Sequence, residues 1–276
     1  MQFIMFTKHL LGLSLTELIK SLVYVGVSGA DLAVRKNYPI NPDNMEKALP
    51  SAAKSFKDAG LEIPIVTAPT SLTQPTSDSA ETFYAACGAA SIPHIKLGYW
   101  HWSPDQPFWD CVFKIREWLN TFEQWSIRYN VKTLIHNHSG NSLGMNSSQI
   151  MHLISECNPA HVGVFADPGH LSVCGEPIEM ALSIVEKYLS CIAFKDRIRI
   201  SLPESQGGYR KRGAPNKTYT VPLGLGFVDC EATISTLQKM EFRGPISIHS
   251  EYDESIEDVL SLTKLDLNYI NQLLNK

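Results

Sequence analysis

Short apolar runs alternate with longer amphipathic segments along the whole chain. The apolar runs are rich in Ile, Val, Leu and Phe, and several of them are apolar on both faces. Strands that are buried on both sides have this composition, as in a parallel sheet that is covered by helices. We therefore predict eight strands, over residues 3–7, 29–34, 63–68, 94–99, 132–137, 161–166, 191–196 and 245–250.

The segments between these strands have the periodicity of helices. The first of them opens with Ser14 and places Glu17 three positions later, which is the spacing of a capping box. The expected helices span residues 14–26, 41–60, 79–90, 107–129, 146–156, 176–189, 229–239 and 255–274. Eight strands and eight helices in strict alternation predict an α/β fold, a (β/α)8 TIM barrel that forms a single domain over residues 1–276.

One connection is unusually long, because residues 197–224 separate the seventh strand from the next helix. A loop of this length inside a compact domain is usually functional or mobile. The loops that follow the strands also form the active-site face of a TIM barrel. We therefore expect a long loop after strand 7 that serves as a lid or as an oligomer contact, and we leave a homodimer open.

The composition narrows the range of partners. The chain has 276 residues, a net charge of −4 and no run of Lys and Arg, which argues against nucleic acid as a partner. No segment approaches the roughly 18 uninterrupted apolar residues of a membrane span. The six scattered cysteines indicate reduced core residues. Lys8 and His9 interrupt the apolar N-terminus, so we expect a cytoplasmic protein and leave a trimmed export signal open.

Polar residues gather where the predicted strands end. In a (β/α)8 barrel these ends meet at one face, which is where active sites lie. A single histidine there is more often a hydrogen-bonding loop residue than a ligand, but several imidazoles, carboxylates and lysines on one face favour a functional site. His and carboxylate ligands suit Zn, Mn, Co or Fe. The strand-end residues are Lys8, Arg35, Tyr99, His101, His136, His138, Asp167, His170, Lys195, His249 and Glu251.

Residues near these strand ends also suit a small sugar or polyol. The stretch 99-YWHW-102 follows the fourth strand, and aromatic faces stack well on the apolar faces of sugars. The alternative is that these rings pack a loop or a dimer contact. Basic side chains near the rim suit a phosphate or a carboxylate, although the sequence does not show that an anion is required. The predicted substrate-binding residues are Lys8, Arg35, Tyr99, His101, Trp102 and Arg199.

Five motifs follow one another in a characteristic order. They are 132-KTLIHNHSG-140, 163-GVFADPGHLSVCGEP-177, 192-IAFKD-196, 222-PLGLGFVD-229 and 244-GPISIHSEY-252. Their order resembles the xylose isomerase-like TIM barrel superfamily, also called the sugar phosphate isomerase/epimerase or AP endonuclease family 2-like group. The resemblance covers nearly the whole chain. Tagatose epimerase, inosose dehydratase and endonuclease IV are members of this superfamily, and the chain looks like a divergent member.

The resemblance implies a metal site that departs from the family pattern. Well-studied members hold one divalent metal with a glutamate on strand five, the aspartate of D-x-x-H on strand six, a histidine on strand seven and a glutamate on strand eight. Here His136 and His249 stand at the two glutamate positions, and Ala193 stands at the histidine position. Only Asp167 is unchanged. The implied site therefore has three ligands, His136, Asp167 and His249, for Zn, Mn, Co or Fe.

Two questions about this site stay open at the level of the sequence. A fourth ligand could come from His138 or from Glu251. Alternatively, the metal has been lost and Lys195 supplies the positive charge.

The resemblance also bears on the chemistry. The epimerases of the family move a proton with two glutamates, and neither is present here at its usual position. A mechanism with one base remains, with Glu251, His138 or Lys195 as the base, and His170 matches the family's substrate-contacting histidine. Our predicted catalytic residues are Glu251, Lys195, His138 and His170.

The expected function is that of a sugar or polyol isomerase or epimerase, which abstracts a proton next to a carbonyl with or without help from a metal. The first alternative is a lyase or dehydratase that acts on a keto-sugar or a keto-inositol. The second is a carbohydrate-binding barrel without catalysis, because a fold alone does not give a function. A metal-dependent nuclease is disfavoured by the short set of ligands and by the net charge of −4.

Overall fold

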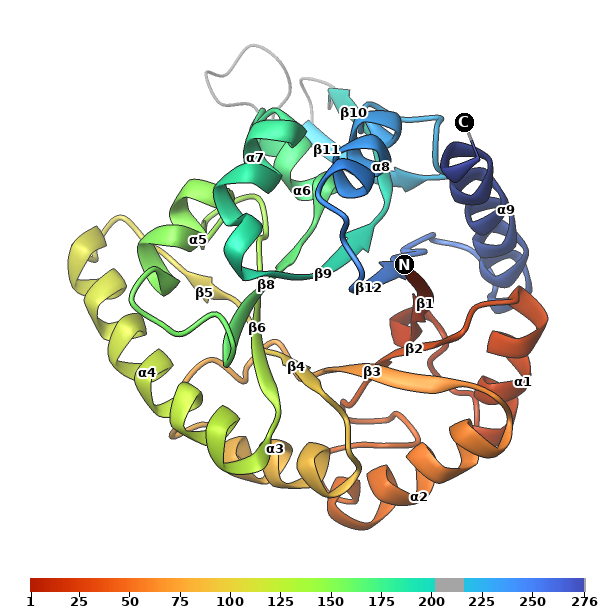
Figure 1. The fold of residues 1–276 in the computed structure, drawn as a ribbon, viewed down its shortest axis with the longest axis horizontal. Helices are drawn as coiled ribbons and strands as arrows, with labels where there is room; N and C mark the ends of the chain where they lie inside the picture. Colours follow the sequence, from red (N-terminus) through yellow and green to blue (C-terminus); the bar gives the residue numbers. More distant parts are fainter. Residues whose placement is uncertain (202–215, 276) are drawn as a thin grey trace.

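Eight parallel strands close into a barrel in the computed structural model, which describes residues 1–201 and 216–275 (Figure 1). The barrel closes where β1, at the N-terminus, pairs with β12, close to the C-terminus. All eight predicted strands are confirmed. In order around the barrel they are β1 (Gln2–Phe6), β2 (Gly29–Ala33), β3 (Glu62–Thr67), β4 (His94–Lys96), β6 (Lys132–His136), β8 (Val162–Ala166), β9 (Leu189–Phe194) and β12 (Pro245–Ile248).

The helices form an outer ring around this barrel (Figure 1). Helix α1 has the predicted capping box, in which Ser14 and Glu17 bond to each other's backbone N–H groups. None of the helices within the described residues has the length and the apolar content that a membrane crossing requires. The helices at the predicted places are α1 (Leu15–Val25), α2 (Met45–Asp58), α3 (Ala80–Ala89), α4 (Phe108–Tyr129), α5 (Ser147–Ile154), α7 (Ile178–Val185), α8 (Cys230–Lys239) and α9 (Ile256–Leu274).

Two helices, α2 and α6 (Pro168–Cys174), differ most from the prediction. Helix α2 begins at Met45 rather than at residue 41, because the side chains of Asn41 and Asn44 bond to local backbone N–H groups and form a turn before the helix. Helix α6 was not predicted. Asp167 caps it and proline occupies its first turn, so the start signal was present in the sequence.

The connection over residues 197–224 is not the irregular loop that we predicted. Strands β10 (Asp196–Ser201) and β11 (Asn216–Val221) pair in an antiparallel ladder along its described part. Ile198 and Ile200 alternate with arginines in β10, and Tyr219 and Val221 are separated by Thr220 in β11, which is the two-residue period of strands. Residues 202–215 lie outside the described residues, and so does any lid or oligomer contact that they form. A second short ladder joins β5 (Trp100–His101) to β7 (Ser142–Leu143).

Side chains fill the barrel interior in layers. Since side chains alternate along a strand, residues two positions apart point to the same side. A buried apolar layer is made by Ile4, Ile65, Leu134, Phe165, Cys191 and Ala193. Two positions beyond Leu134, Phe165 and Ala193 stand His136, Asp167 and Lys195. The polar residues therefore form the next layer of the same barrel, at the carboxyl ends of its strands.

Candidate active site

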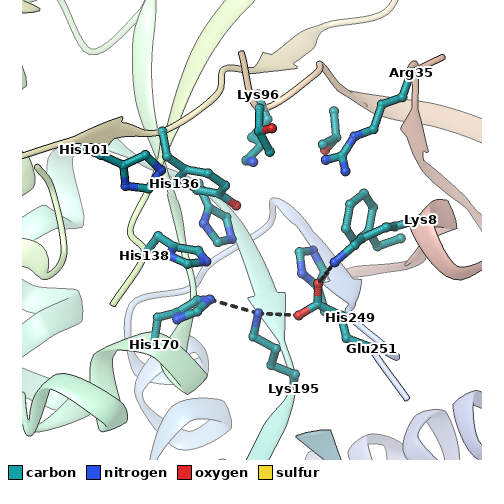
Figure 2. A pocket seen from close by; sticks show the side chains of 14 residues that line it. Lys8, Arg35, Lys96, His101, His136, His138, His170, Lys195, His249 and Glu251 are labelled. Carbon is teal, nitrogen blue, oxygen red and sulfur yellow. Dashed lines mark hydrogen bonds and ion pairs between the residues drawn. The ribbon is translucent and has the colours of Figure 1, made fainter. Parts of the chain in front are cut away.

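A cavity of about 290 Å³ opens at the carboxyl ends of the barrel strands (Figure 2). Ten of the predicted site residues line it, namely Lys8, Arg35, Tyr99, His101, His136, His138, His170, Lys195, His249 and Glu251. Asp167 is fully buried directly beneath them, in ionic contact with Lys195. The structure thus brings together residues that end or follow β1, β2, β4, β6, β8, β9 and β12 and that are far apart in the sequence.

Asp167 is held in place by its neighbours on all sides. Its Oδ1 accepts a hydrogen bond from the backbone N–H of His170 at 3.0 Å, as the cap of helix α6. The side chain of Asn137 accepts from the Asp167 N–H at 2.6 Å and donates to the Asp167 carbonyl at 3.1 Å. These contacts leave Oδ2 directed toward the cavity residues. Asn137, the middle residue of the HNH triplet, therefore positions the aspartate rather than the substrate.

Lys195 lies between two carboxylates. Its Nζ is 2.8 Å from Asp167 Oδ2 and 2.9 Å from Glu251 Oε2, and its side chain is only 2% exposed. Burial alone would raise the pKa of Asp167, but the charge of Lys195 holds that pKa well below the usual value. The pKa of Glu251 is depressed in the same way, against the effect of burial, by Lys195 and then Lys8. Both carboxylates are therefore ionised at neutral pH.

Glu251 has cations on both of its oxygens. Lys8 Nζ lies 3.0 Å from Oε1, and the guanidinium of Arg197 lies 3.7 Å from Oε2. Figure 2 shows the resulting chain of contacts from Lys8 through Glu251 and Lys195 to His170. The last link is a distance of 3.2 Å between Lys195 Nζ and His170 Nε2.

The buried atoms without a hydrogen-bond partner include four from the predicted metal ligands: His136 Nδ1 and Nε2, Asp167 Oδ2 and His249 Nε2. Ligand atoms from these same residues all lie within 4.8 Å of one another. Burial lowers the pKa of His136 to about 3, so its imidazole is neutral, which is the form that binds a metal. Unpaired buried polar atoms are rare in native proteins. These residues therefore fit a divalent metal, in the three-ligand arrangement that the sequence predicted.

One atom of this set is shared. Asp167 Oδ2 lies in ionic contact with Lys195 Nζ at 2.8 Å, although the pair does not form a hydrogen bond. A metal on Asp167 would have the ammonium of Lys195 as its neighbour. The two cations would compete for the same oxygen, and either can neutralise it.

A buried carboxylate that we did not predict stands behind His249. Asp31 is fully buried in β2, and its Oδ2 lies 3.4 Å from His249 Nε2. It also accepts hydrogen bonds from Thr67 Oγ1 at 2.5 Å and from Ser247 Oγ at 3.2 Å. A charged residue inside the apolar run GADLAV was the signal for it, because Asp is almost never fully buried without partners.

His138 presents a free nitrogen to the cavity. Its Nδ1 lies 3.0 Å from the carbonyl oxygen of Ser139. A carbonyl only accepts hydrogen bonds, so Nδ1 carries the proton and Nε2 keeps its lone pair. Burial lowers the pKa of His138 to about 4, with a further contribution from the charge of Lys195. The ring packs between Tyr99 and His170, with centroid distances of 4.5 Å and 4.1 Å.

Lys96 is a second residue that the sequence analysis missed. It ends β4, lines the cavity and is only 3% exposed. Its Nζ lies 3.9 Å from the ring centroid of Tyr99. Burial lowers the pKa of Lys96 to about 7, and the nearby charge of Arg35 lowers it as well. A lysine in the middle of the predicted strand HIKLGY was the available signal.

Two predicted substrate contacts lie elsewhere. Trp102 does not line this cavity, because its Nε1 donates to the carbonyl of Gln106 and its ring borders a neighbouring hollow with Phe108. Arg199 lies on β10, where it donates to the carbonyl of Val173 at 2.9 Å. The role of both residues as substrate contacts stays a prediction.

Comparison with known families agrees with this architecture. A sequence profile of the family described as "xylose isomerase-like TIM barrel" matches residues 19–272. A search of curated protein sequences gives no significant match.

Solved structures show the same fold at low identity. D-psicose 3-epimerase from Clostridium cellulolyticum H10 is 11% identical, with a TM-score of 0.74 and 99% of both chains covered. 3-Keto-D-glucoside 4-epimerase from E. coli is 12% identical, with a TM-score of 0.74 and 99% of both chains covered. The IolI protein, solved with a bound zinc atom, is 13% identical, with a TM-score of 0.78 and 100% of both chains covered. At such identities these matches establish the fold alone.

Proposed function

The chain belongs to the xylose isomerase-like TIM barrel family, and from this premise we propose that it is an isomerase or epimerase of a small sugar or polyol-derived ketone. The proposed reaction is abstraction of a proton from the carbon next to the carbonyl. The observation that supports it best is the ammonium of Lys195, which is buried between Asp167 and Glu251 at a cavity of about 290 Å³. A concave site with a few placed polar groups is typical of small-molecule binding.

Lys195 would stabilise the charge that develops in this reaction. Removing the proton moves negative charge onto the carbonyl oxygen and gives an enediolate. A cation that is already fixed in a dry site stabilises such an oxyanion strongly, because nothing has to reorganise during the reaction. Asp167 and Glu251 hold Lys195 by ion pairs of 2.8 Å and 2.9 Å. In this proposal both carboxylates position the lysine, and the substrate oxygen binds beside its Nζ.

His138 is the residue that we assign as the base. Its Nε2 keeps a lone pair because Nδ1 faces the carbonyl oxygen of Ser139 at 3.0 Å. With a pKa of about 4, the imidazole is neutral at pH 7 and free to accept a proton from carbon. Glu251 is a weaker candidate, because both of its oxygens already contact cations. His170, which packs against His138 at 4.1 Å between centroids, keeps the ring in place.

His136, Asp167 and His249 would hold a divalent metal in the same site. When bound, such a metal supplies a second positive charge that polarises the carbonyl oxygen. The protein's part is to keep both imidazoles oriented: the His136 ring packs edge-on against Phe165 at 5.0 Å, and the His249 ring packs against Phe6 at 4.6 Å.

Exchange of deuterium from solvent into ketoses tests the proposal. The purified protein is incubated in D2O with D-fructose, D-tagatose or a keto-inositol, and the proton signal next to the carbonyl is followed by NMR. We expect loss of this signal with at least one ketose. Lys195→Met and His138→Gln are each expected to slow the exchange by about 100-fold or more, as loss of a charge-stabilising group or a base does.

Lys57→Met is the matched control, because it removes an exposed lysine on α2, away from the cavity. The proposal is wrong if exchange persists unchanged in both site variants. Product analysis then separates the reaction types, since an isomer identifies an isomerase or epimerase and loss of water identifies a dehydratase.

A further inference from the structure

Two cations in the cavity have no carboxylate partner. Lys8 and Lys195 are neutralised by Glu251 and Asp167. Within residues 1–201 and 216–275, by contrast, no carboxylate oxygen lies within ion-pair distance of Lys96 Nζ or of the Arg35 guanidinium. The Nε atom of Arg35 is also buried without a hydrogen-bond partner. Burial of an unpaired charge is unfavourable, so this arrangement needs an explanation.

Aromatic rings take the place of counterions for both residues. Lys96 Nζ lies 3.9 Å from the ring centroid of Tyr99, and Arg35 Cζ lies 5.8 Å from that of Phe6. Asp31, the nearest carboxylate in β2, does not serve as a partner, because its oxygens contact Thr67, Ser247 and His249 instead. Rings orient a cation but leave its charge available for a ligand.

Both side chains point into the cavity from the wall opposite Lys195 (Figure 2). Arg35 follows β2 and Lys96 ends β4, so they come from the two strands that flank β3 in the barrel. The cavity thus has one wall with the neutralised Asp167–Lys195–Glu251 cluster and another with uncompensated positive charge.

We propose that Arg35 and Lys96 form an anion subsite, and that the substrate is an acidic sugar whose carboxylate or phosphate group binds there. This inference rests on the proposed function, which places the reacting carbonyl at Lys195. The two subsites then bind opposite ends of one molecule. A guanidinium and an ammonium together suit the oxygens of a carboxylate or a phosphate, to which charge-assisted hydrogen bonds are short and strong. A neutral sugar would leave both charges uncompensated.

Calorimetric titration with three probes of similar length tests the subsite. The probes are sorbitol, which is neutral, gluconate and sorbitol 6-phosphate, all at constant ionic strength and at pH 6, below the pKa of about 7 to which burial lowers Lys96. We expect at least one anion to bind about tenfold or more tightly than sorbitol. Arg35→Gln and Lys96→Met should each remove most of this preference, measured as the ratio of anion to sorbitol affinity within each variant. Stronger binding of gluconate or of sorbitol 6-phosphate identifies the group as a carboxylate or a phosphate.

Arg243→Gln is the matched control, because it removes the same charge from an exposed site just before β12, at the other end of the barrel. Circular dichroism and thermal unfolding verify that each variant is folded. The subsite is overturned if the three probes bind equally, if none binds, or if Arg35→Gln and Lys96→Met keep the full preference for the anion. Deuterium exchange into neutral ketoses is a separate measurement, so the proposed function can stand when the subsite fails.

Discussion

Asn137 illustrates how single contacts fix the site. Its side chain makes two hydrogen bonds to the backbone of Asp167, at 2.6 Å and 3.1 Å, and it is almost fully buried. Asn137→Ala would leave the buried N–H of Asp167 without its acceptor, whereas the Asp167 carbonyl would still accept from the backbone N–H groups of helix α6. We expect a loss of about 1 to 3 kcal/mol in the free energy of unfolding, measured by urea denaturation. Asn141→Ala, which removes an exposed amide that donates to the Trp102 carbonyl, should change the free energy of unfolding little. Equal losses in the two variants would contradict the role of Asn137 in holding Asp167.

Lys96 should make the stability of the protein depend on pH. Burial lowers its pKa in the folded state from 10.5 to about 7. Between these values the unfolded chain binds a proton that the folded protein does not, so wild-type stability rises with pH across this window and is lowest at or below pH 7. Lys96→Met removes the contribution of this titration to the pH dependence of stability. We expect the variant to be more stable than wild type at pH 7, by on the order of a few kcal/mol, and less so at pH 9.5.

Urea midpoints of wild type and Lys96→Met at pH 7 and pH 9.5 measure this difference. Other groups titrate in the same range, but they are common to both proteins and cancel in the comparison. Lys57→Met, at an exposed site on α2, is the control and should follow the wild-type profile. Parallel profiles for wild type and Lys96→Met would show that Lys96 keeps its proton in the folded state.

At the scale of elements, Asp196 organises the turn that follows β11. Its Oδ2 accepts from the backbone N–H groups of Gly224 and Gly226, at 3.0 Å and 2.8 Å. Its Oδ1 accepts from those of Val228 and Arg197, at 3.0 Å and 2.7 Å. A side chain on Gly226 would meet Asp196 Oδ1 at 2.1 Å, so only glycine fits there. The motif PLGLGFVD is thus explained by backbone packing around one carboxylate, next to Lys195.

Replacing this carboxylate should weaken the whole turn. In Asp196→Asn one oxygen becomes an NH2 group, which donates and cannot accept, so two backbone N–H groups lose their acceptor. We expect a loss of about 2 to 4 kcal/mol in unfolding free energy. Asp43→Asn, at an exposed position before α2, should have almost no effect. If thermal unfolding shows the two variants to be equally stable, the turn does not depend on the carboxylate.

At the scale of the whole molecule, the barrel could be predicted because its signals are local. Strands that are buried on both faces read as apolar runs, and helices read as amphipathic segments, so eight alternating pairs indicate the fold. The ladder of β10 and β11 was missed, although the alternation in RIRIS and KTYTV is visible in the sequence. The length of the connection favoured the prediction of a loop over that of a strand pair.

The site was predictable only in part. The grouping of His136, Asp167 and His249 followed from the strand ends and the family motifs, and the structure places these residues together. Asp31 and Lys96 were missed because each interrupts an apolar run. Their burial depends on contacts from other strands, such as Thr67 and Ser247 on Asp31. Hydrogen bonds from residues distant in the sequence offset the burial of such a charge, and a local sequence pattern does not reveal them.

Metal binding would stabilise the whole molecule against unfolding, since a ligand that binds only the folded state raises the free energy of unfolding. We expect Zn, Mn or Co at about 100 times its dissociation constant to add about 2.7 kcal/mol, which raises the unfolding temperature by roughly 5 °C. His249→Ala and Asp167→Asn should abolish the shift, whereas His161→Ala, outside the site, should keep it. An identical shift in His249→Ala would place the metal elsewhere.

The same measurement can separate the two cations that share Asp167. Lys195 Nζ lies 2.8 Å from Asp167 Oδ2, the oxygen that a metal would use. Lys195→Met removes this competitor and the repulsion between the two charges, so the variant is expected to bind the metal more tightly than wild type, by about tenfold or more. Metal titrations followed by thermal unfolding measure the difference. Weaker binding in Lys195→Met would mean that the lysine helps to build the metal site instead of competing with it.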